Sequence, residues 1–142
     1  MINQAVIILV SVLMALTTQG TGSQITIKID LKSEAKGLVQ LLLFKGEKGF
    51  PDQSDEAVLS ASARVENGKA IFKFSNLDKG TYAVAAFHDG NEDGEMRKTL
   101  LGIPKDAYGF SNNARGTFSA PSFESASFEL PEGSHTISFI LK

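Results

Sequence analysis

The stretch QITIKIDL, at residues 24–31, alternates apolar and polar side chains. In an extended chain, alternate side chains point to the same side, so its isoleucines share one face. A period of two is typical of a half-buried β-strand. The same pattern returns in HTISFIL, at residues 135–141, where Ile137, Phe139 and Leu141 point together. Both ends of the domain are therefore predicted to be strands.

The residues between these two stretches contain further strand patterns. LVQLLLF, at residues 38–44, is continuously apolar and predicts a central strand covered on both faces. The stretches 60–66 and 69–75 flank Asn67-Gly68, a sequence that favours a β-hairpin. Two more strands are predicted at 81–88 and 123–130.

No stretch shows a sustained apolar period of 3.6 residues, which argues against long amphipathic helices. About seven short strands separated by frequent turns favour an all-β fold. The sequence predicts a single antiparallel β-sandwich of prealbumin-like or immunoglobulin-like type, at residues 24–142. Much of its core is expected to come from six of the ten phenylalanines, which fall within predicted strands: Phe44, Phe72, Phe74, Phe87, Phe128 and Phe139.

The composition excludes several classes of site and partner. The 142 residues include no cysteine, which excludes a disulfide framework, a thiolate zinc site and a thiol nucleophile. The net charge of −2 gives no basic surface of the kind that attracts phosphates, so no nucleic-acid partner is expected.

The N-terminal segment differs from the rest of the chain. Residues 1–23 carry no charged side chain, and Ala5 to Leu16 form an apolar run. This run is shorter than the roughly 20 residues that span a bilayer as a helix, and it fits the apolar region of a secretory signal peptide. We expect a signal peptide at residues 1–23, cleaved near residues 20–23, although no basic residue precedes the run. The alternative is a buried N-terminal element. The mature domain is then periplasmic or secreted, with no transmembrane span.

Residues 89–122 form a long stretch without strand pattern, between the fifth and sixth predicted strands. Loops longer than about 15 residues in compact domains are usually functional or disordered. This one sets apolar anchors between turn-forming residues, and so predicts an ordered loop pinned to the edge of the sandwich. The apolar residues are Leu100, Leu101, Ile103, Tyr108, Phe110 and Phe118. A functional site is expected here.

An acidic motif opens this loop, with oxygen-bearing side chains at every second position: Asp89, Asn91, Asp93 and Glu95. The spacing D-x-N-x-D-G is that of a calcium-binding loop. The ninth and twelfth positions, Arg97 and Leu100, supply no oxygen ligand, so only half of the motif is present. The two alternatives are a weak Ca²⁺ site and an acidic turn whose side chains cap their own backbone N–H groups.

Three blocks of sequence carry a resemblance, at residues 82–89, 102–114 and 121–124. Together with the pattern G-x-Y-A-x-x-x-x-H-D-x-N at residues 80–91, they resemble the family catalogued as domain of unknown function 2141. The resemblance implies a small exported bacterial protein with one sandwich domain, and it implies no reaction. Members often carry an Asp near the position of Arg97 and a second Pro beside Pro121. The departures at Arg97 and Ala120 weaken the case for a metal.

A ligand site is predicted at Tyr108, Phe110, Asn112 and Asn113. The two aromatic rings could form a shelf for a carbohydrate or peptide, and the alternative is a loop that packs on itself. We therefore expect a non-catalytic exported module that binds a glycan, peptide or protein of the cell envelope. A calcium-stabilised structural domain is the alternative. A small hydrolase using His88 is a third, disfavoured because no G-x-S-x-G elbow is present.

Overall fold

The computed structural model describes residues 22–142 of the chain. The predicted signal peptide lies outside this range except for its last two residues, and it stays a prediction. The described residues contain eight strands: β1 (Ser23–Asp30), β2 (Leu38–Lys45), β3 (Leu59–Arg64), β4 (Lys69–Leu77), β5 (Gly80–Asp89), β6 (Tyr108–Phe110), β7 (Phe128–Leu130) and β8 (Ser134–Ile140). Two 3₁₀ turns, η1 (Ser54–Glu56) and η2 (Ser111–Asn113), and one short helix, α1 (Phe123–Ala126), complete the elements.

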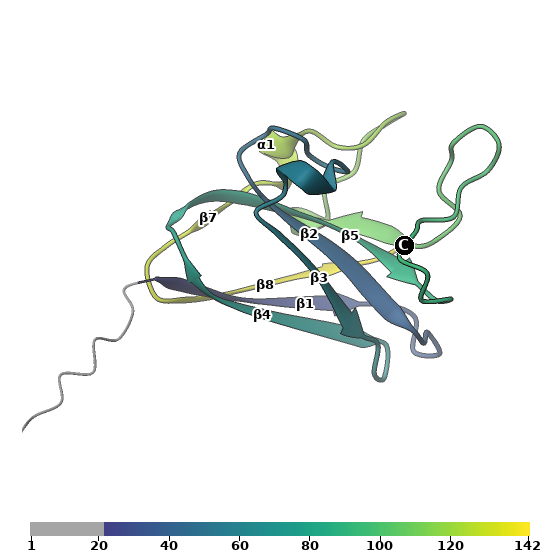
Figure 1. Ribbon diagram of the computed structural model, residues 1–142, viewed down its shortest axis with the longest axis horizontal. Helices are drawn as coiled ribbons and strands as arrows, with labels where there is room; N and C mark the ends of the chain where they lie inside the picture. The colour runs from purple at the N-terminus through teal and green to yellow at the C-terminus, as the bar shows by residue number, and fades with distance from the viewer. Residues whose placement is uncertain (1–21) are drawn as a thin grey trace, which may run out of the picture.

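The strands form two sheets, and the predicted all-β class is confirmed (Figure 1). One sheet has the order β4-β1-β8, and the other has the order β3-β2-β5-β6, with β7 also pairing β5. The expectation of purely antiparallel pairing was wrong, because β1 and β8 run parallel. The turn before β8 lies beside the start of β1, where the N–H of Gln24 donates to the carbonyl of Gly133 at 2.8 Å. The two strands therefore begin at the same end of the sheet.

The main core lies between the two sheets. The isoleucines of β1 are buried, as the alternation of residues 24–31 predicts. They pack in one cluster with Phe139 of the neighbouring strand β8 and with side chains of the facing sheet, including Val39, Leu41, Leu43, Tyr82 and Val84. Burying side chains of this size stabilises the fold by roughly 1.5–3 kcal/mol each.

A second apolar cluster covers the outer face of the five-stranded sheet. Its centre is Phe50, whose ring makes edge contacts with Phe44, Phe110 and Phe123 at centroid distances of 5.5, 5.9 and 5.8 Å. Phe44, from β2, is fully buried in this cluster. Strand β2 is thus covered on both faces, as its continuous apolar run predicts.

The predicted hairpin at Asn67-Gly68 is only partly correct. Both residues have positive φ, 51° and 71°, which is the backbone that an Asn-Gly turn requires. The flanking strands, however, belong to different sheets: β3 pairs β2, and β4 pairs β1. A single bridge between Glu66 and Lys69 closes the turn. The turn carries the chain from one sheet to the other, because Ala70 and Phe72 of β4 are buried in the core beside β1.

The prediction of a sixth strand over residues 123–130 was also wrong in its first half. Residues 123–126 form α1, and the residue before it, Ser122, accepts a hydrogen bond from the N–H of Ser125 on its side-chain oxygen. This is an N-cap, which favours a helical turn over an extended chain. The predicted loop over residues 89–122 is in turn interrupted by β6, which pairs β5. The count of seven strands thus becomes eight.

Candidate functional site

Asp89, the last residue of β5, is fully buried. Its Oδ2 accepts hydrogen bonds from Nε2 of Gln40 and from the N–H of Gly94, both at 2.8 Å, and its Oδ1 accepts one from the N–H of Asp93 at 3.2 Å. Gln40 lies on β2 and itself accepts a hydrogen bond from Ser62 on β3. One carboxylate therefore joins the neighbouring strand to the turn that follows β5.

The pKa of Asp89 lies below its ordinary value. Burial by itself raises the pKa, but the hydrogen bonds from Gln40, Gly94 and Asp93 stabilise the ionised form more strongly. The group therefore carries its negative charge at neutral pH.

The other residues of the acidic motif are exposed. Asp93 accepts hydrogen bonds from the N–H of Glu95 at 2.9 Å and from Nδ2 of Asn91 at 3.0 Å. These contacts match the acidic turn, which is one of the two alternatives that the sequence analysis left open. Within residues 22–142, no group of three or more His, Cys, Asp or Glu side chains is placed to hold a metal ion. Calcium binding by Asp89, Asn91, Asp93 and Glu95 stays a prediction.

His88 is half-buried at the end of β5. Its Nε2 lies 2.5 Å from the backbone carbonyl of Lys36, in the segment that precedes β2. The ring thus ties the end of β5 to this segment.

A hairpin extends from the sheet between β5 and β6, and we call residues 97–105 the projecting hairpin. The N–H of Lys105 donates to the carbonyl of Arg97, and the N–H of Thr99 donates to the carbonyl of Ile103, both at 2.8 Å. At its base, buried Asp106 accepts hydrogen bonds from the backbone N–H of Arg97 at 2.7 Å and from its Nε at 2.8 Å. The Nη2 of Arg97 also lies 2.6 Å from Asp106 Oδ1.

Burial raises the pKa of Asp106, but the hydrogen bonds and charge of Arg97 outweigh this and hold the pKa below its ordinary value. Sequence reasoning treated Arg97 only as a defect in the calcium motif and did not single out Asp106. The sequence did contain one signal of this contact: the oppositely charged residues Arg97 and Asp106 lie on either side of an apolar turn.

The tip of the projecting hairpin is apolar and exposed, so the expectation that its apolar residues pin the loop to the sandwich was wrong. The relative exposures of Leu100, Leu101 and Ile103 are 108%, 87% and 57%. Phe118, in the segment between η2 and α1, is 101% exposed. We call residues 115–121 the Phe118 loop. Figure 1 shows both segments extending beyond the sheets at the upper right, in green and yellow-green.

The four predicted ligand residues lie within six consecutive residues, 108–113, but have different surroundings. Phe110 is buried in the second apolar cluster. Tyr108 is half-buried, and the guanidinium of Arg115 lies 4.9 Å from the centre of its ring. Asn112 donates hydrogen bonds to the carbonyl of Ser125 at 3.3 Å and to that of Ser127 at 2.7 Å. Asn113 accepts a hydrogen bond from the N–H of Ile140 on β8 at 2.9 Å.

These contacts join η2 to α1 and β8. Both asparagines have positive φ, 61° and 51°, as expected for residues that form tight turns. Ligand binding by the four residues stays a prediction.

Ser111 is a structural residue, and its sequence surroundings, GFSNN at residues 109–113, lack the second glycine of the G-x-S-x-G elbow of a serine nucleophile. Its buried side chain accepts a hydrogen bond from the N–H of Val84 at 2.9 Å and donates to the carbonyl of Ala126. It therefore joins β5 to α1. No periodic pattern in the sequence identifies a polar residue of this kind.

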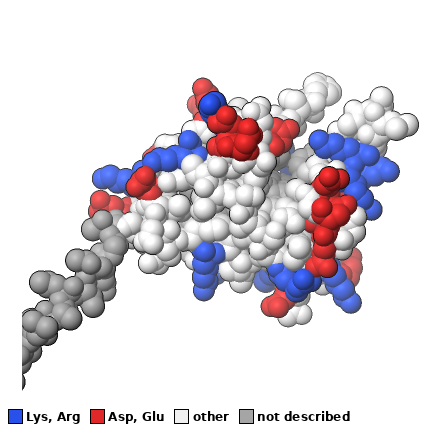
Figure 2. All heavy atoms as spheres, viewed as in Figure 1, with Lys and Arg blue, Asp and Glu red and all other residues white. Residues whose placement is uncertain are grey.

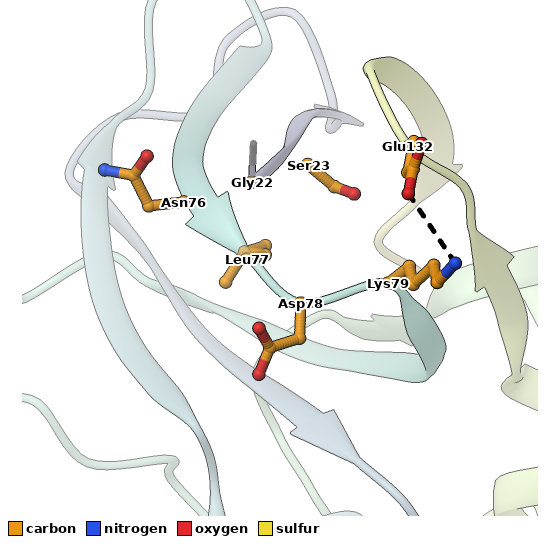
Figure 3. Close-up of a pocket in the computed structure, with 7 residues that line it drawn as sticks. All are labelled: Gly22, Ser23, Asn76, Leu77, Asp78, Lys79 and Glu132. Carbon is orange, nitrogen blue, oxygen red and sulfur yellow. Dashed lines mark ion pairs between the residues drawn. The ribbon is translucent and has the colours of Figure 1, made fainter. Parts of the chain in front are cut away.

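A surface depression lies at the other end of the sheets, beside the start of β1 (Figure 3). It is lined by residues 22–23, 76–79 and Glu132, and an ion pair between Lys79 and Glu132 crosses its rim at 3.6 Å. A second depression lies over residues 63–71. Neither includes a predicted site residue.

The comparisons with known proteins identify a family. No curated protein and no solved structure matches the chain. A family model described as an uncharacterized protein conserved in bacteria matches residues 27–138, from within β1 to within β8. The chain therefore belongs to this bacterial family, domain of unknown function 2141, as its three sequence blocks predict.

Proposed function

We propose that the chain is a non-catalytic binding module of the bacterial cell envelope, built as a β-sandwich of prealbumin-like or immunoglobulin-like type. The observation that carries the proposal is a pair of loops that expose large apolar side chains and are held at their bases by buried polar contacts. The partner is a component of the envelope, a class that includes glycans, peptides, proteins and lipids.

Exposed apolar side chains gathered on loops mark interaction sites more often than single exposed ones do. Leu100, Leu101 and Ile103 come together within one turn. The base of that turn is fixed by the contact between Arg97 and Asp106. A loop that is already ordered loses less conformational entropy on binding.

The absence of catalysis is part of the proposal, and the surroundings of two side chains support it. The side chain of Ser111 is buried and hydrogen-bonded, and the Nε2 of His88 is directed at a backbone carbonyl. Both groups have structural partners. A hydrolase that uses His88 has the least support.

The proposal is tested by sedimentation of the full chain with washed envelope fragments from the bacterium that encodes it. We expect the wild type to sediment with the fragments. A variant with Leu100→Ser, Leu101→Ser, Ile103→Ser and Phe118→Ser is expected to bind at least tenfold more weakly. The matched control is Val58→Ser with Ile71→Ser, which removes exposed apolar side chains elsewhere. Equal sedimentation of both variants, or none by the wild type, would contradict the proposal.

Export is a separate part of the proposal. Cell fractionation should find the protein in the periplasm or the medium, with a new N-terminus that mass spectrometry can read. Ser23 is buried in β1, and a Cβ on Gly22 would lie 2.5 Å from Cα of Asn76. Cleavage before Gly22 therefore keeps the contacts that β1 makes within residues 22–142. Retention of the uncleaved chain in the cytoplasm would overturn this part.

A calcium-stabilised structural domain is the second candidate. Four oxygen-bearing side chains within one turn, one of them a buried carboxylate, favour it. A bound ion stabilises the folded state by mass action, so excess Ca²⁺ should raise the melting temperature of the wild type. Asp93→Ala should abolish the rise, whereas Asp52→Ala, an exposed aspartate elsewhere, should keep it. A wild-type melting temperature unaffected by Ca²⁺ excludes this candidate.

A further inference from the structure

We infer that the projecting hairpin inserts its apolar tip into the surface of an anionic phospholipid bilayer, with the Phe118 loop as a second contact. This inference rests on the proposed binding function and names its partner. Three features carry it: the shape of the tip, the charge around it and the contacts that hold its base.

The tip is convex, and its apolar side chains extend into solvent. The N–H of Gly102 donates to the carbonyl of Thr99 at 2.9 Å, which closes the turn and leaves Leu100 and Leu101 outside it. Gly102 has a φ of 79°, and a Cβ added to it would meet no atom within 4 Å. Leu100, Leu101 and Gly102 at the tip are therefore left largely uncovered by the described part of the chain.

Basic residues surround the tip. Arg97, Lys98 and Lys105 lie at the two ends of the projecting hairpin, and no acidic residue lies between them. Residues 96–121 contain four basic residues and one acidic residue, although the whole chain has a net charge of −2. The acidic residue, Asp106, is buried against Arg97. At the place of the projecting hairpin, Figure 2 shows a white protrusion with blue side chains beneath it and red ones farther away.

This combination fits a membrane surface better than a protein surface. Stable protein interfaces bury about 800 Å² on each partner, over packed and complementary surfaces. A narrow apolar tip offers little such area. Insertion into a bilayer needs only a few apolar side chains at the depth of the acyl chains and basic residues at the depth of the anionic headgroups. In the projecting hairpin, the apolar side chains lie at the tip and the basic residues lie nearer the base, which is the order that insertion requires.

The experiment uses the full chain and vesicles of equal parts phosphatidylglycerol and phosphatidylcholine, with pure phosphatidylcholine vesicles beside them. Sedimentation should detect binding to the mixed vesicles and at least tenfold weaker binding to the neutral ones. High salt should weaken binding to the mixed vesicles, because it screens the basic residues. Leu100→Ser with Leu101→Ser should lower the affinity at least tenfold, and the control Ile71→Ser should not change it.

The basic residues are tested in the same assay. Lys98→Gln with Lys105→Gln should weaken binding about fivefold for each charge removed. The matched control is Lys28→Gln with Lys73→Gln, which removes two exposed lysines from β1 and β4.

Insertion itself is read by fluorescence. The chain contains no tryptophan, so Leu101→Trp introduces a single reporter at the tip. Its emission should shift to shorter wavelength on anionic vesicles, and Ile71→Trp should show no shift.

Three results overturn the inference. If the wild type binds envelope fragments through the tip but not the vesicles, the lipid partner is wrong and the proposed binding function stands. If it binds neither, both are wrong. If light scattering shows that the serine substitutions at the tip dissolve a dimer and vesicle binding is absent, the tip joins two copies of the chain.

Discussion

At the scale of single residues, this protein uses buried polar side chains to hold loops onto strands. Asp89, Asp106 and Ser111 are buried, and each accepts a hydrogen bond from a backbone N–H. A buried charge is costly unless hydrogen bonds replace its hydration. Within residues 22–142, every buried side-chain nitrogen and oxygen has a hydrogen-bond partner. Removing one of these groups should therefore cost more than removing an exposed one.

Asp89→Ala tests this directly. The substitution leaves the side-chain amide of Gln40 and the N–H groups of Asp93 and Gly94 without their acceptor. We expect a loss of roughly 2–4 kcal/mol in the free energy of unfolding, measured by urea denaturation. Asp93→Ala, an exposed neighbour, should cost under about 1 kcal/mol. Similar losses for the two variants would show that burial of Asp89 does not matter.

Asn112 combines a backbone requirement with a side-chain contact, and two substitutions separate them. Asn112→Gly keeps the positive φ of 61° but loses the hydrogen bonds to the carbonyls of Ser125 and Ser127. Asn112→Ala loses both, and the left-handed backbone costs roughly 1–2 kcal/mol for a residue with a Cβ. Alanine should therefore destabilise the protein more than glycine by about that amount, as measured by thermal unfolding. If glycine destabilises as much as alanine, the backbone requirement is wrong.

At the scale of elements, the contact between β6 and the end of β8 connects the two sheets at one edge. The backbone groups of Tyr108 and Lys142 exchange two hydrogen bonds, each at 3.1 Å. Gly109 permits this approach, because a Cβ there would lie 2.5 Å from the carbonyl oxygen of Ile140. The same edge carries η2, whose Asn113 binds β8. The elements that hold the base of the Phe118 loop are thus part of the connection between the sheets.

Gly109→Ala is expected to destabilise this edge by about 1–3 kcal/mol, since the added methyl group overlaps backbone atoms that cannot easily move. Hydrogen exchange should locate the loss at β6 and β8. Gly90→Ala is the matched control, because neither glycine has a positive φ and the nearest atom to a Cβ on Gly90 is 3.5 Å away. Equal stability of the two variants would show that the close approach is not required.

The elements that the sequence predicted well are those whose apolar pattern is also their burial pattern. The isoleucines of β1 and the apolar run of β2 are of this kind. Which strands pair is not determined by such patterns, so the turn at Asn67-Gly68 was predicted correctly and its sheet partners were not. The stretch 123–130 fits an alternating strand equally well, and the cap at Ser122 decides for a helix.

The sequence analysis expected a functional site within residues 89–122, without the details of its structure. Residues 89–122 do contain the projecting hairpin, and Leu100, Leu101 and Ile103 were noted in the sequence. The contact between Arg97 and Asp106 depends on where the chain returns after the turn, which the linear sequence does not state.

At the scale of the whole molecule, the two ends of the sheets differ in character. Figure 1 places the start of β1 at one end and the projecting hairpin at the other. The segment that follows β5 lies at this second end. It begins directly after Asp89, the last residue of β5, and it contains Asp106. Both carboxylates are buried, and both have a lowered pKa in the folded protein. Their ionisation is therefore coupled to folding.

The stability of the protein should consequently fall in acid. A carboxyl group whose pKa is lower in the folded than in the unfolded chain stabilises the fold when the pH is above the unfolded-state pKa, here 3.8. This contribution is lost as the pH falls from there toward the folded-state pKa. In that window, each of the two aspartates adds a slope of up to about 1.4 kcal/mol per pH unit to the free energy of unfolding.

Urea denaturation at a series of pH values measures this slope. Asp106→Asn keeps the shape of the side chain but removes its titration, so its free energy of unfolding should be lower at neutral pH and should fall less steeply in acid. Asp55→Asn, at an exposed aspartate in η1, should follow the wild-type curve. If Asp106→Asn retains the full wild-type slope, Asp106 does not contribute to the acid sensitivity. Its contact with Arg97 then positions the projecting hairpin without making the stability of the protein depend on pH.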